Sequence, residues 1–311
     1  MTSFFTPVQT QINQVEDLIR SQSLGYHAAL VAALNHLLTS GGKRIRPTMI
    51  LLLGRILRAD SKNLLTLAAA IELLHTATLV HDDLIDGSLL RRGIPTLNSR
   101  WTPGATVLTG DFLFARAAKL AADTNSIPVM QVFAGILSTI VNGEISQLFS
   151  SRCQIDLENY YRRIYAKTAS LFEASARLTG LISPVNSDMI DFVSKYGHDI
   201  GMAFQIVDDV FDFIGEENHL GKPVGSDLRQ GLITLPAIYY IESHPSDADV
   251  INLRKGYCPV SDDEIESFVN KVRGSSAIEL SMQAADRYTE SALNKLLTLP
   301  ECAERSNLEE L

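Results

Sequence analysis

The sequence predicts an all-α protein: one large domain, residues 1–311, of long, mostly antiparallel helices around a central apolar cavity. Long segments repeat apolar residues at steps of three and four, which is the spacing of one helix face. Glycine and proline fall between these segments, where helices end. The short alternating runs that an all-β fold requires are not found in the sequence.

Five long helices follow from this spacing, at residues 63–90, 104–122, 127–150, 157–181 and 187–214. The first is typical, because Leu67, Ile71 and Leu74 recur on one helix face. The part from Ser243 onward is more polar, and we expect it to lie at the periphery. No linker rich in Pro, Gly or Ser divides the chain. The breakers between helices are Gly41-Gly42, Gly93 to Pro95, Pro103-Gly104, Pro128, Pro184 and the loop from Gly215 to Gly231.

The composition excludes several classes of function. Apolar residues make up 46% of the chain and charged residues 20%, as in ordinary globular proteins. The net charge is −9 without a basic block, which argues against nucleic acid as a partner. Cys153, Cys258 and Cys302 are far apart and odd in number, so we expect no disulfide or metal pattern, and a cytoplasmic location.

We expect no segment that enters a membrane. The N-terminus lacks the basic and then apolar segments of a secretory signal. No uninterrupted apolar run reaches about 18 residues, so we expect no transmembrane helix and at most peripheral membrane contact.

A motif of three aspartates, D-D-x-x-D, occurs twice, and the copies lie 208 − 82 = 126 residues apart. In each copy the first and third aspartates are four residues apart, so they share one helix face. Both copies lie toward the C-terminal end of a long apolar helix, where partial negative charge disfavours acids. The copies are Asp82, Asp83 and Asp86, and Asp208, Asp209 and Asp212.

One acidic helix end is usually a solvated surface feature, but two copies of identical spacing favour a function. Clustered carboxylates without nitrogen or sulfur ligands suit hard cations, of which Mg²⁺ is the usual one. Magnesium keeps some waters and is commonly completed by phosphate oxygens. Two facing acidic patches would therefore hold several Mg²⁺ ions around one diphosphate.

Basic residues predict a second kind of anion site. The segment from Gly41 to Pro47 places Lys43 and Arg46 at a helix start, where backbone amides also attract anions. Each basic residue alone is more often a solvated surface group, and a histidine or glutamine on an apolar helix is more often a core residue. The further candidates are His75, Arg91 and Arg92 around the first motif, Lys167 and Thr168 in an apolar helix, Gln205 near the second motif, and Lys222 in the loop after it.

With these motifs the chain resembles the trans-isoprenyl diphosphate synthases, also called polyprenyl synthetases. The resemblance extends from about Gly41 to Pro236 and rests on GGKRIRP, LLHTATLVHDDLIDGSLLRRG, KTASLF, FQIVDDVFDF and GKPVGSDLRQG. The segment HTATLVHDD is most similar to medium- and long-chain members. The resemblance implies a Mg²⁺-dependent homodimer that joins isopentenyl diphosphate to an allylic diphosphate, giving an all-trans product longer than farnesyl.

The resemblance also implies a role for each candidate. Three aspartates are implied as magnesium ligands, and the other three as ligands or as their support. Lys167 is implied to act in catalysis as well as in binding. The implied sets are Asp82, Asp86 and Asp208 for the metal, with Asp83, Asp209 and Asp212 in support; Arg91, Lys167, Thr168, Gln205 and Lys222 for the allylic diphosphate; and Lys43, Arg46, His75 and Arg92 for isopentenyl diphosphate.

The sequence departs from the family pattern in two places. Members often carry a lysine after the DLRQG segment, where this chain has Leu232, so one cation near the diphosphate is missing. The chain ends at SNLEEL without the basic tail of some members.

Two small residues bear on product length. Ala77 lies five residues before Asp82, about 7.5 Å down the helix axis, and Thr78 lies four residues before it. Short-chain members often have an aromatic residue at these positions, so its absence favours a longer product. The alternative is that Ala77 is small only because helices cross there.

Three rival functions are kept. A short-chain synthase of farnesyl or geranylgeranyl diphosphate would need its cavity closed by other residues, and Leu74, Ile71, Phe112 and Phe114 could supply such a floor. A class I terpene cyclase ionises one diphosphate and does not need the second basic set. A non-catalytic subunit of a heteromeric synthase would be expected to have lost acids, whereas both motifs are complete here.

Overall fold

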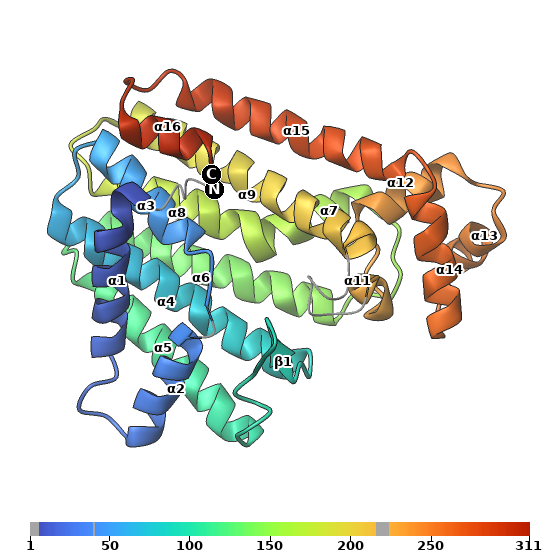
Figure 1. Ribbon diagram of the computed structural model, residues 1–311, viewed down its shortest axis with the longest axis horizontal. Helices are drawn as coiled ribbons and strands as arrows, with labels where there is room; N and C mark the ends of the chain where they lie inside the picture. Colours follow the sequence, from blue (N-terminus) through green and yellow to red (C-terminus); the bar gives the residue numbers. More distant parts are fainter. Residues whose placement is uncertain (1–5, 40, 216–223) are drawn as a thin grey trace. The chain divides into compact units, whose positions relative to one another are not determined.

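The computed structural model describes residues 6–39, 41–215 and 224–311, and regular structure in these ranges is almost entirely helical (Figure 1). The all-α prediction is therefore confirmed. The chain forms two compact units. Unit 1 comprises Met1–Ile136, Phe172–Gly197 and Leu293–Leu311, and unit 2 comprises Leu137–Leu171 and His198–Ala292. The single domain over residues 1–311 stays a prediction.

The predicted helices are present with small shifts at their ends, and one is divided. The helix expected at 157–181 consists of α7, the π-helical turn η2 and α8. The elements are η1 (Thr6–Val8), α1 (Gln9–Ser21), α2 (Ala28–Thr39), α3 (Ile45–Ile56), α4 (Ser61–Ile85), β1 (Leu90–Arg91), β2 (Ile94–Pro95), α5 (Pro103–Ala122), α6 (Ile127–Leu148), α7 (Leu157–Ile164), η2 (Tyr165–Ala169), α8 (Ser170–Leu181), α9 (Ser187–Ile214), α11 (Ser226–Arg229), α12 (Leu235–Ser243), α13 (Ala248–Arg254), α14 (Asp262–Arg273), α15 (Ala277–Leu296) and α16 (Ala303–Glu309).

In unit 1, α4 is the central helix and packs along α5 and against α1 and α3. It begins at Asp60, whose side chain accepts a hydrogen bond from the Asn63 amide and so caps the first turn. A Cβ atom on Gly110 of α5 would lie 2.1 Å from the His81 ring, so only glycine allows this close approach. This packing holds the C-terminal end of α4, which carries the first acidic motif.

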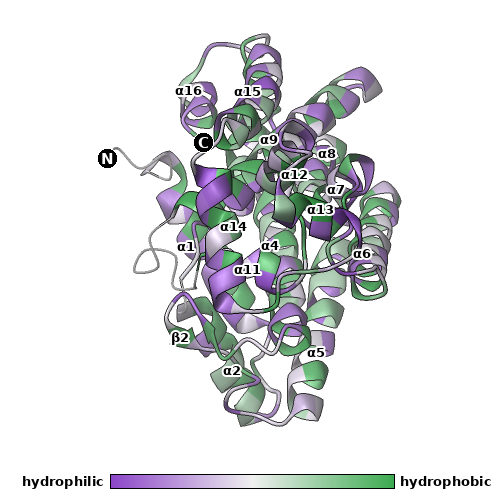
Figure 2. Ribbon diagram, turned by 90° about the vertical axis from the view of Figure 1, so that its right-hand side faces the viewer, coloured by the Kyte–Doolittle hydropathy of each residue, from purple (hydrophilic) through white to green (hydrophobic). Residues whose placement is uncertain are grey.

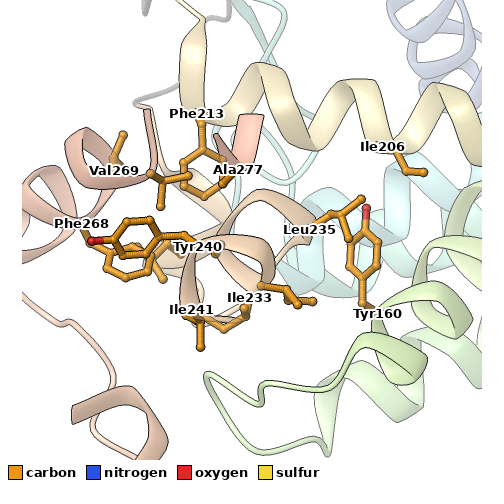
Figure 3. Close-up of a cluster of buried hydrophobic side chains, with 14 of the residues drawn as sticks. Tyr160, Ile206, Phe213, Ile233, Leu235, Tyr240, Ile241, Phe268, Val269 and Ala277 are labelled. Atoms are coloured by element: carbon orange, nitrogen blue, oxygen red, sulfur yellow. The ribbon is translucent and has the colours of Figure 1, made fainter. Parts of the chain in front are cut away.

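In unit 2, a core of buried side chains lies under the second half of α9 (Figure 3). Phe213 of α9, Tyr160 of α7 and Phe268 of α14 are among its largest members. The expectation that the chain beyond Ser243 is peripheral is wrong, because α14 places Ile265 and Phe268 in this core. The polar composition of this part of the chain suggested exposure, because α14 buries only one narrow apolar stripe.

Most helices mix hydrophobic and hydrophilic residues (Figure 2), yet α4 and α6 are long and apolar enough to cross a membrane by length and composition alone. The expectation of no such helix counted only uninterrupted apolar runs. The most apolar window of α4 is 67% buried, as in a core helix, whereas that of α6 is 22% buried. The exposed apolar surface of α6 therefore needs an explanation.

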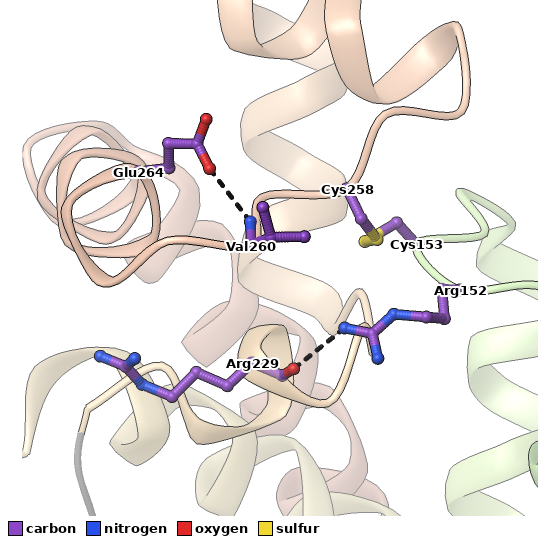
Figure 4. The surroundings of a disulfide bond; sticks show 6 residues. All are labelled: Arg152, Cys153, Arg229, Cys258, Val260 and Glu264. Atoms are coloured by element: carbon purple, nitrogen blue, oxygen red, sulfur yellow. Dashed lines mark hydrogen bonds between the residues drawn. A yellow bond between two sulfur atoms is a disulfide. The ribbon is translucent and has the colours of Figure 1, made fainter.

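A disulfide joins Cys153 and Cys258 in unit 2, with their Cα atoms 5.7 Å apart (Figure 4). The expectation of no disulfide is wrong. Sequence spacing gave no sign of the bond, because the fold brings together residues 105 positions apart. The Cys153 amide also donates to the Gly231 carbonyl oxygen at 2.7 Å, so the bond lies beside the segment that follows α11.

Reduction of this disulfide is expected to lower the free energy of unfolding by about 2–4 kcal/mol, because the bond closes a long loop in the unfolded chain. Cys153→Ser should have the same effect, measured by urea unfolding with and without reductant. Cys302→Ser is the matched control, since Cys302 is a free thiol. Identical unfolding midpoints for Cys153→Ser and Cys302→Ser would contradict this expectation.

Candidate active site

The first acidic motif lies at the C-terminal end of α4, in unit 1. Asp86 is the C-cap of the helix, so the three aspartates stand where the helix carbonyls disfavour negative charge. Asp83 is buried, and Nε and Nη2 of Arg91 both lie 2.8 Å from its Oδ1. Burial raises the pKa of Asp83, and the Arg91 guanidinium opposes this shift. Asp82 is only half-buried and Asp86 is exposed, so these two carboxylates can reach a ligand.

A short hairpin holds the arginines that follow the motif. β1 and β2 pair antiparallel around a two-residue turn, Arg92-Gly93, beside the end of α4 (Figure 1). Both turn residues have positive φ, 53° and 74°, as a type I′ turn requires. The Asn98 side chain, three residues after β2, donates to the Asp83 carbonyl oxygen at 3.2 Å and fastens the chain that follows the hairpin to the helix. The hairpin thereby carries Arg91 back to the Asp83 carboxylate.

Arg44 is a structural residue of the basic segment before α3. It has a left-handed backbone, φ 47°, at the N-cap position. Its guanidinium lies 2.9 Å from a carboxylate oxygen of Glu16 and 2.8 Å from one of Glu72. These ion pairs fix the direction in which the chain enters α3.

Arg46, two residues further on, is a candidate for anion binding. Its guanidinium lies over the Phe172 ring, 4.3 Å from the ring centroid. Its Nε is buried and has no hydrogen-bond partner among the described residues. Burial lowers the pKa of Arg46 to about 10, so the side chain stays charged at neutral pH. A buried cationic donor without an acceptor is a site that an anion would complete.

The pKa of His75 shows that the electrostatic potential in this region is positive. Burial lowers its pKa well below the usual value, and the positive charges of Arg46, Arg91, Arg92 and Arg44 lower it further. The imidazole is therefore neutral at pH 7. Four guanidinium groups that disfavour a proton on one histidine create a potential that attracts anions.

Most of the set predicted for isopentenyl diphosphate is thus gathered in one region of unit 1. Besides burial, the positive charges of Arg46 and Arg92 both lower the pKa of His75. The Arg92 guanidinium also donates to the Gly41 carbonyl oxygen. Lys43 is exposed and adjoins this region in the sequence.

The second acidic motif lies near the C-terminal end of α9, in unit 2. Asp208 is exposed, whereas Asp209 is buried and accepts hydrogen bonds at both carboxylate oxygens. Gln205 Nε2 donates to its Oδ1 at 2.7 Å, and the Tyr160 hydroxyl donates to its Oδ2 at 2.8 Å. Burial, with the Asp227 charge, raises the pKa of Asp209, and the two donors oppose the shift. Asp208 is left as the carboxylate with the greatest access to a ligand.

Asp212 supports the backbone that follows the motif. It is buried, and its Oδ1 accepts from the Ser226 hydroxyl at 2.6 Å. Its Oδ2 accepts from the Asp227 amide at 3.1 Å, at the start of α11. Among the alternatives for Asp212, this geometry favours support over metal ligation. Lys222, predicted for the same loop, lies outside the described residues.

The candidates Lys167 and Thr168 lie in η2, where the helix widens to π geometry. Such turns insert an extra residue into a helix and are frequent at functional sites. Lys167 Nζ lies 3.0 Å from a carboxylate oxygen of Glu144 on α6. The buried Thr168 hydroxyl donates to Gln205 Oε1 at 2.6 Å. This contact joins η2 to α9 within unit 2.

Sequence reasoning missed three residues of these networks: Tyr160, Glu144 and Arg44. Tyr160 precedes Lys167 by seven residues, about two helical turns, and this spacing could have indicated a shared face. Glu144 and Arg44 gave no such signal, because their partners come from distant segments of the chain. Leu232, where members often have lysine, is half-buried, and its effect stays a prediction.

The donor chemistry fits a hard cation. The accessible groups, Asp82, Asp86 and Asp208, offer only carboxylate oxygens. Among the described residues, no three His, Cys, Asp or Glu side chains converge closely enough to hold a metal ion. Magnesium typically binds through one or two carboxylates, with water and substrate phosphates completing its coordination.

The two positions assigned to product length differ in exposure. Ala77 is fully buried within unit 1, which favours the alternative that it is small for helix packing. Thr78 is half-buried, and its hydroxyl donates to the His75 carbonyl oxygen at 2.8 Å. Thr78 is therefore the better placed of the two to contact a ligand.

Comparison with known proteins gives a consistent result. Residues 27–272 match the polyprenyl synthetase family. The chain is 40% identical over 298 residues to heptaprenyl diphosphate synthase component 2 of Geobacillus stearothermophilus, covering 95% of this chain and 92% of that protein. A polyprenyl synthase from Caulobacter crescentus, solved with calcium and isoprenyl diphosphate, has a TM-score of 0.92 and 34% identity, covering 99% of this chain and 94% of that one. Heptaprenyl diphosphate synthase of Staphylococcus aureus has a TM-score of 0.91 and 33% identity, covering 97% and 95%.

Proposed function

Because the chain belongs to the polyprenyl synthetase family, we propose that it condenses isopentenyl diphosphate with an allylic diphosphate to an all-trans polyprenyl diphosphate longer than farnesyl. The proposal rests on the combination of two features: each acidic motif presents accessible carboxylates at a helix end, and, besides burial, a separate cluster of four arginines lowers the pKa of His75. An enzyme that ionises a single diphosphate has no use for that cluster. The name of the Geobacillus stearothermophilus relative, a heptaprenyl synthase component, supports the longer product.

Asp82 and Asp86 in unit 1, and Asp208 in unit 2, would each bind Mg²⁺ through a carboxylate oxygen, with oxygens of the allylic diphosphate as further ligands. Bound magnesium would supply Lewis-acid stabilisation of the negative charge on the leaving diphosphate. The calcium in the Caulobacter crescentus structure supports a site for divalent cations in this family. Asp83 is bonded to Arg91, and Asp209 is bonded to Tyr160 and Gln205. These contacts would hold the C-terminal ends of α4 and α9 in place.

The protein residues position two substrates and exclude water. Lys167 and Arg91 would hold the allylic diphosphate, while Arg46 and Arg92 would hold isopentenyl diphosphate beside the neutral His75. The allylic carbon–oxygen bond breaks and its electron pair leaves with the diphosphate. The double bond of isopentenyl diphosphate then attacks the allylic carbon, and a proton passes to the departing diphosphate. Correct placement of both substrates supplies much of the rate.

A bulky residue below the first motif is expected to shorten the product. Thr78→Phe should shift the main product toward fewer isoprene units, because the ring fills space that the growing chain needs. Ala77→Phe should mainly lower the free energy of unfolding, by about 1–3 kcal/mol, because Ala77 is fully buried, and a shorter product would show that it also lines the cavity. Chromatography of dephosphorylated products and urea unfolding test both variants. An unchanged product distribution in both would show that neither position limits chain length.

We also propose that a second copy of the chain covers the apolar face of α6. Val141, Ile145 and Leu148 are exposed on this face, and Phe149 just after the helix is 82% exposed. Exposed apolar surface of this kind usually marks a protein contact. Because the Geobacillus stearothermophilus relative is called a component, a different partner chain is the alternative.

The purified chain alone tests the activity and the partner together. Labelled isopentenyl diphosphate, farnesyl diphosphate and Mg²⁺ are incubated with it, and light scattering gives its mass in solution. We expect label in an apolar product and the mass of two chains. A folded monomer that transfers no label until a second kind of chain is added would favour the heteromeric alternative.

The place of the reaction in the cell stays a proposal. We propose a cytoplasmic enzyme with peripheral membrane contact at which its apolar product leaves. Because cytosolic thiols are usually kept reduced, the Cys153–Cys258 bond does not add support to this location. Trapping of thiols in intact cells would show whether the bond exists where the enzyme works.

A further inference from the structure

We propose that Tyr160 is a positioning residue: its hydroxyl orients Asp209, and through Asp209 it orients Gln205, for binding of the allylic diphosphate with its metal. This inference rests on the proposed function and adds to it a residue outside both acidic motifs. Tyr160 acts through Asp209 and is not assigned a contact with substrate.

The Tyr160 side chain is fixed in one direction. It is 1% exposed, and it extends from α7 with its hydroxyl toward α9 (Figure 3). The Arg163 guanidinium lies 5.6 Å from the centroid of its ring, and the Tyr161 ring packs edge-on at 5.3 Å. Burial and the Asp209 charge raise its pKa, so the phenol remains a protonated donor. The hydroxyl therefore donates steadily to Asp209.

The donor directions in this network form an ordered series. Gln205 Nε2 donates to Asp209 Oδ1 at 2.7 Å, so the NH₂ group of Gln205 faces Asp209. Its carbonyl oxygen then faces Thr168 and accepts the single hydroxyl proton of that residue. Thr168 has no further proton to give to a diphosphate oxygen. We therefore infer that Thr168 holds Gln205, and that Lys167 is the donor that η2 presents to the anion.

The network clamps α7 and η2 to α9 at two points. One point is the bond from Tyr160 to Asp209, and the other is the bond from Thr168 to Gln205, four residues earlier on α9. Without the Tyr160 hydroxyl, the buried Asp209 side chain would lose one of its two side-chain donors, which leaves a buried oxygen without its hydrogen bond. Asp209 would turn toward another donor, and the amide of Gln205 would lose its fixed orientation.

The test is the binding of Mg²⁺ with inorganic diphosphate, measured by calorimetry on the intact chain. Tyr160→Phe removes one oxygen atom and keeps the ring. We expect it to weaken this binding about tenfold, the scale of one buried hydrogen bond. In turnover we expect a higher KM for the allylic primer and an unchanged KM for isopentenyl diphosphate.

Tyr161→Phe is the matched control. It removes the neighbouring phenol, which bonds to Tyr239 instead of to the motif, and binding should stay at the parent level. Equal binding by Tyr160→Phe and the parent overturns the proposal. A lower unfolding midpoint of Tyr160→Phe with unchanged binding overturns it as well, because the residue is then only structural.

A second variant tests whether Tyr160 acts through Asp209. In an Asp209→Asn background, Tyr160→Phe should weaken binding much less than tenfold, because the two changes remove the same interaction. A loss of equal size in both backgrounds would mean that Tyr160 acts by another route. Neither binding measurement requires turnover, so a parent chain without prenyl transfer refutes the proposed function independently of this result.

Discussion

Asp208→Ala is expected to reduce turnover at least about a thousandfold while leaving the helical content unchanged. Asp208 is the exposed carboxylate of the second motif, and its two companions are bonded to protein donors. Loss of a ligand removes several kcal/mol of charge stabilisation from the transition state. Asp82→Ala should have a comparable effect, and chelation by EDTA should stop the parent enzyme until Mg²⁺ is restored.

Asp188→Ala is the control for these substitutions. Asp188 is also an exposed aspartate of α9, but it lies 208 − 188 = 20 residues away, about 30 Å along the helix. Its removal should leave turnover unchanged. Steady-state rates and circular dichroism of the variants decide the matter. Undiminished turnover after exhaustive chelation would exclude the metal role.

Arg46→Ala and Lys167→Ala are expected to affect different substrates. Arg46 belongs to the basic cluster of unit 1, and Lys167 lies in η2 of unit 2. Arg46→Ala should raise the KM for isopentenyl diphosphate about ten- to a hundredfold, the effect of losing a charge-assisted hydrogen bond. Lys167→Ala should raise the KM for the allylic primer by a similar factor.

The controls separate charge from packing. Arg46→Lys keeps the charge but loses the planar group that lies over Phe172, so it should retain only part of the affinity. Lys119→Ala breaks an exposed ion pair with Asp123 on α5 and should change neither KM. Equal changes of both KM values in both alanine variants would contradict the assignment of two separate sites.

The sequence predicted the long helices well because their apolar faces repeat over many turns. α9 was expected at 187–214 and occupies Ser187–Ile214. The π turn at η2 left no mark in this periodicity, since one extra residue shifts the pattern only slightly. The burial of α14 was not predicted, because Phe268 and Ile265 are spaced on a narrow stripe among charged residues. Periodicity therefore predicts where helices are, and less reliably how deeply they are buried.

The candidate site shows the same limit. Spacing within a helix predicted that Asp82 and Asp86 share a face, and both retain access to solvent. It could not predict that Tyr160 bonds to Asp209, or that Cys153 bonds to Cys258, because these pairs depend on tertiary contacts. The small size of Ala77 fits either a cavity-lining role or close helix packing. Its complete burial, which the sequence does not show, favours packing.

The most direct test of the proposed function is the length of the product made by the purified chain. Labelled isopentenyl diphosphate and farnesyl diphosphate are incubated with the enzyme and Mg²⁺, and the dephosphorylated products are separated by reversed-phase chromatography against prenyl alcohol standards. We expect label in all-trans alcohols longer than farnesol. Label that remains in isopentenyl diphosphate, with a folded enzyme and Mg²⁺ present, would contradict it.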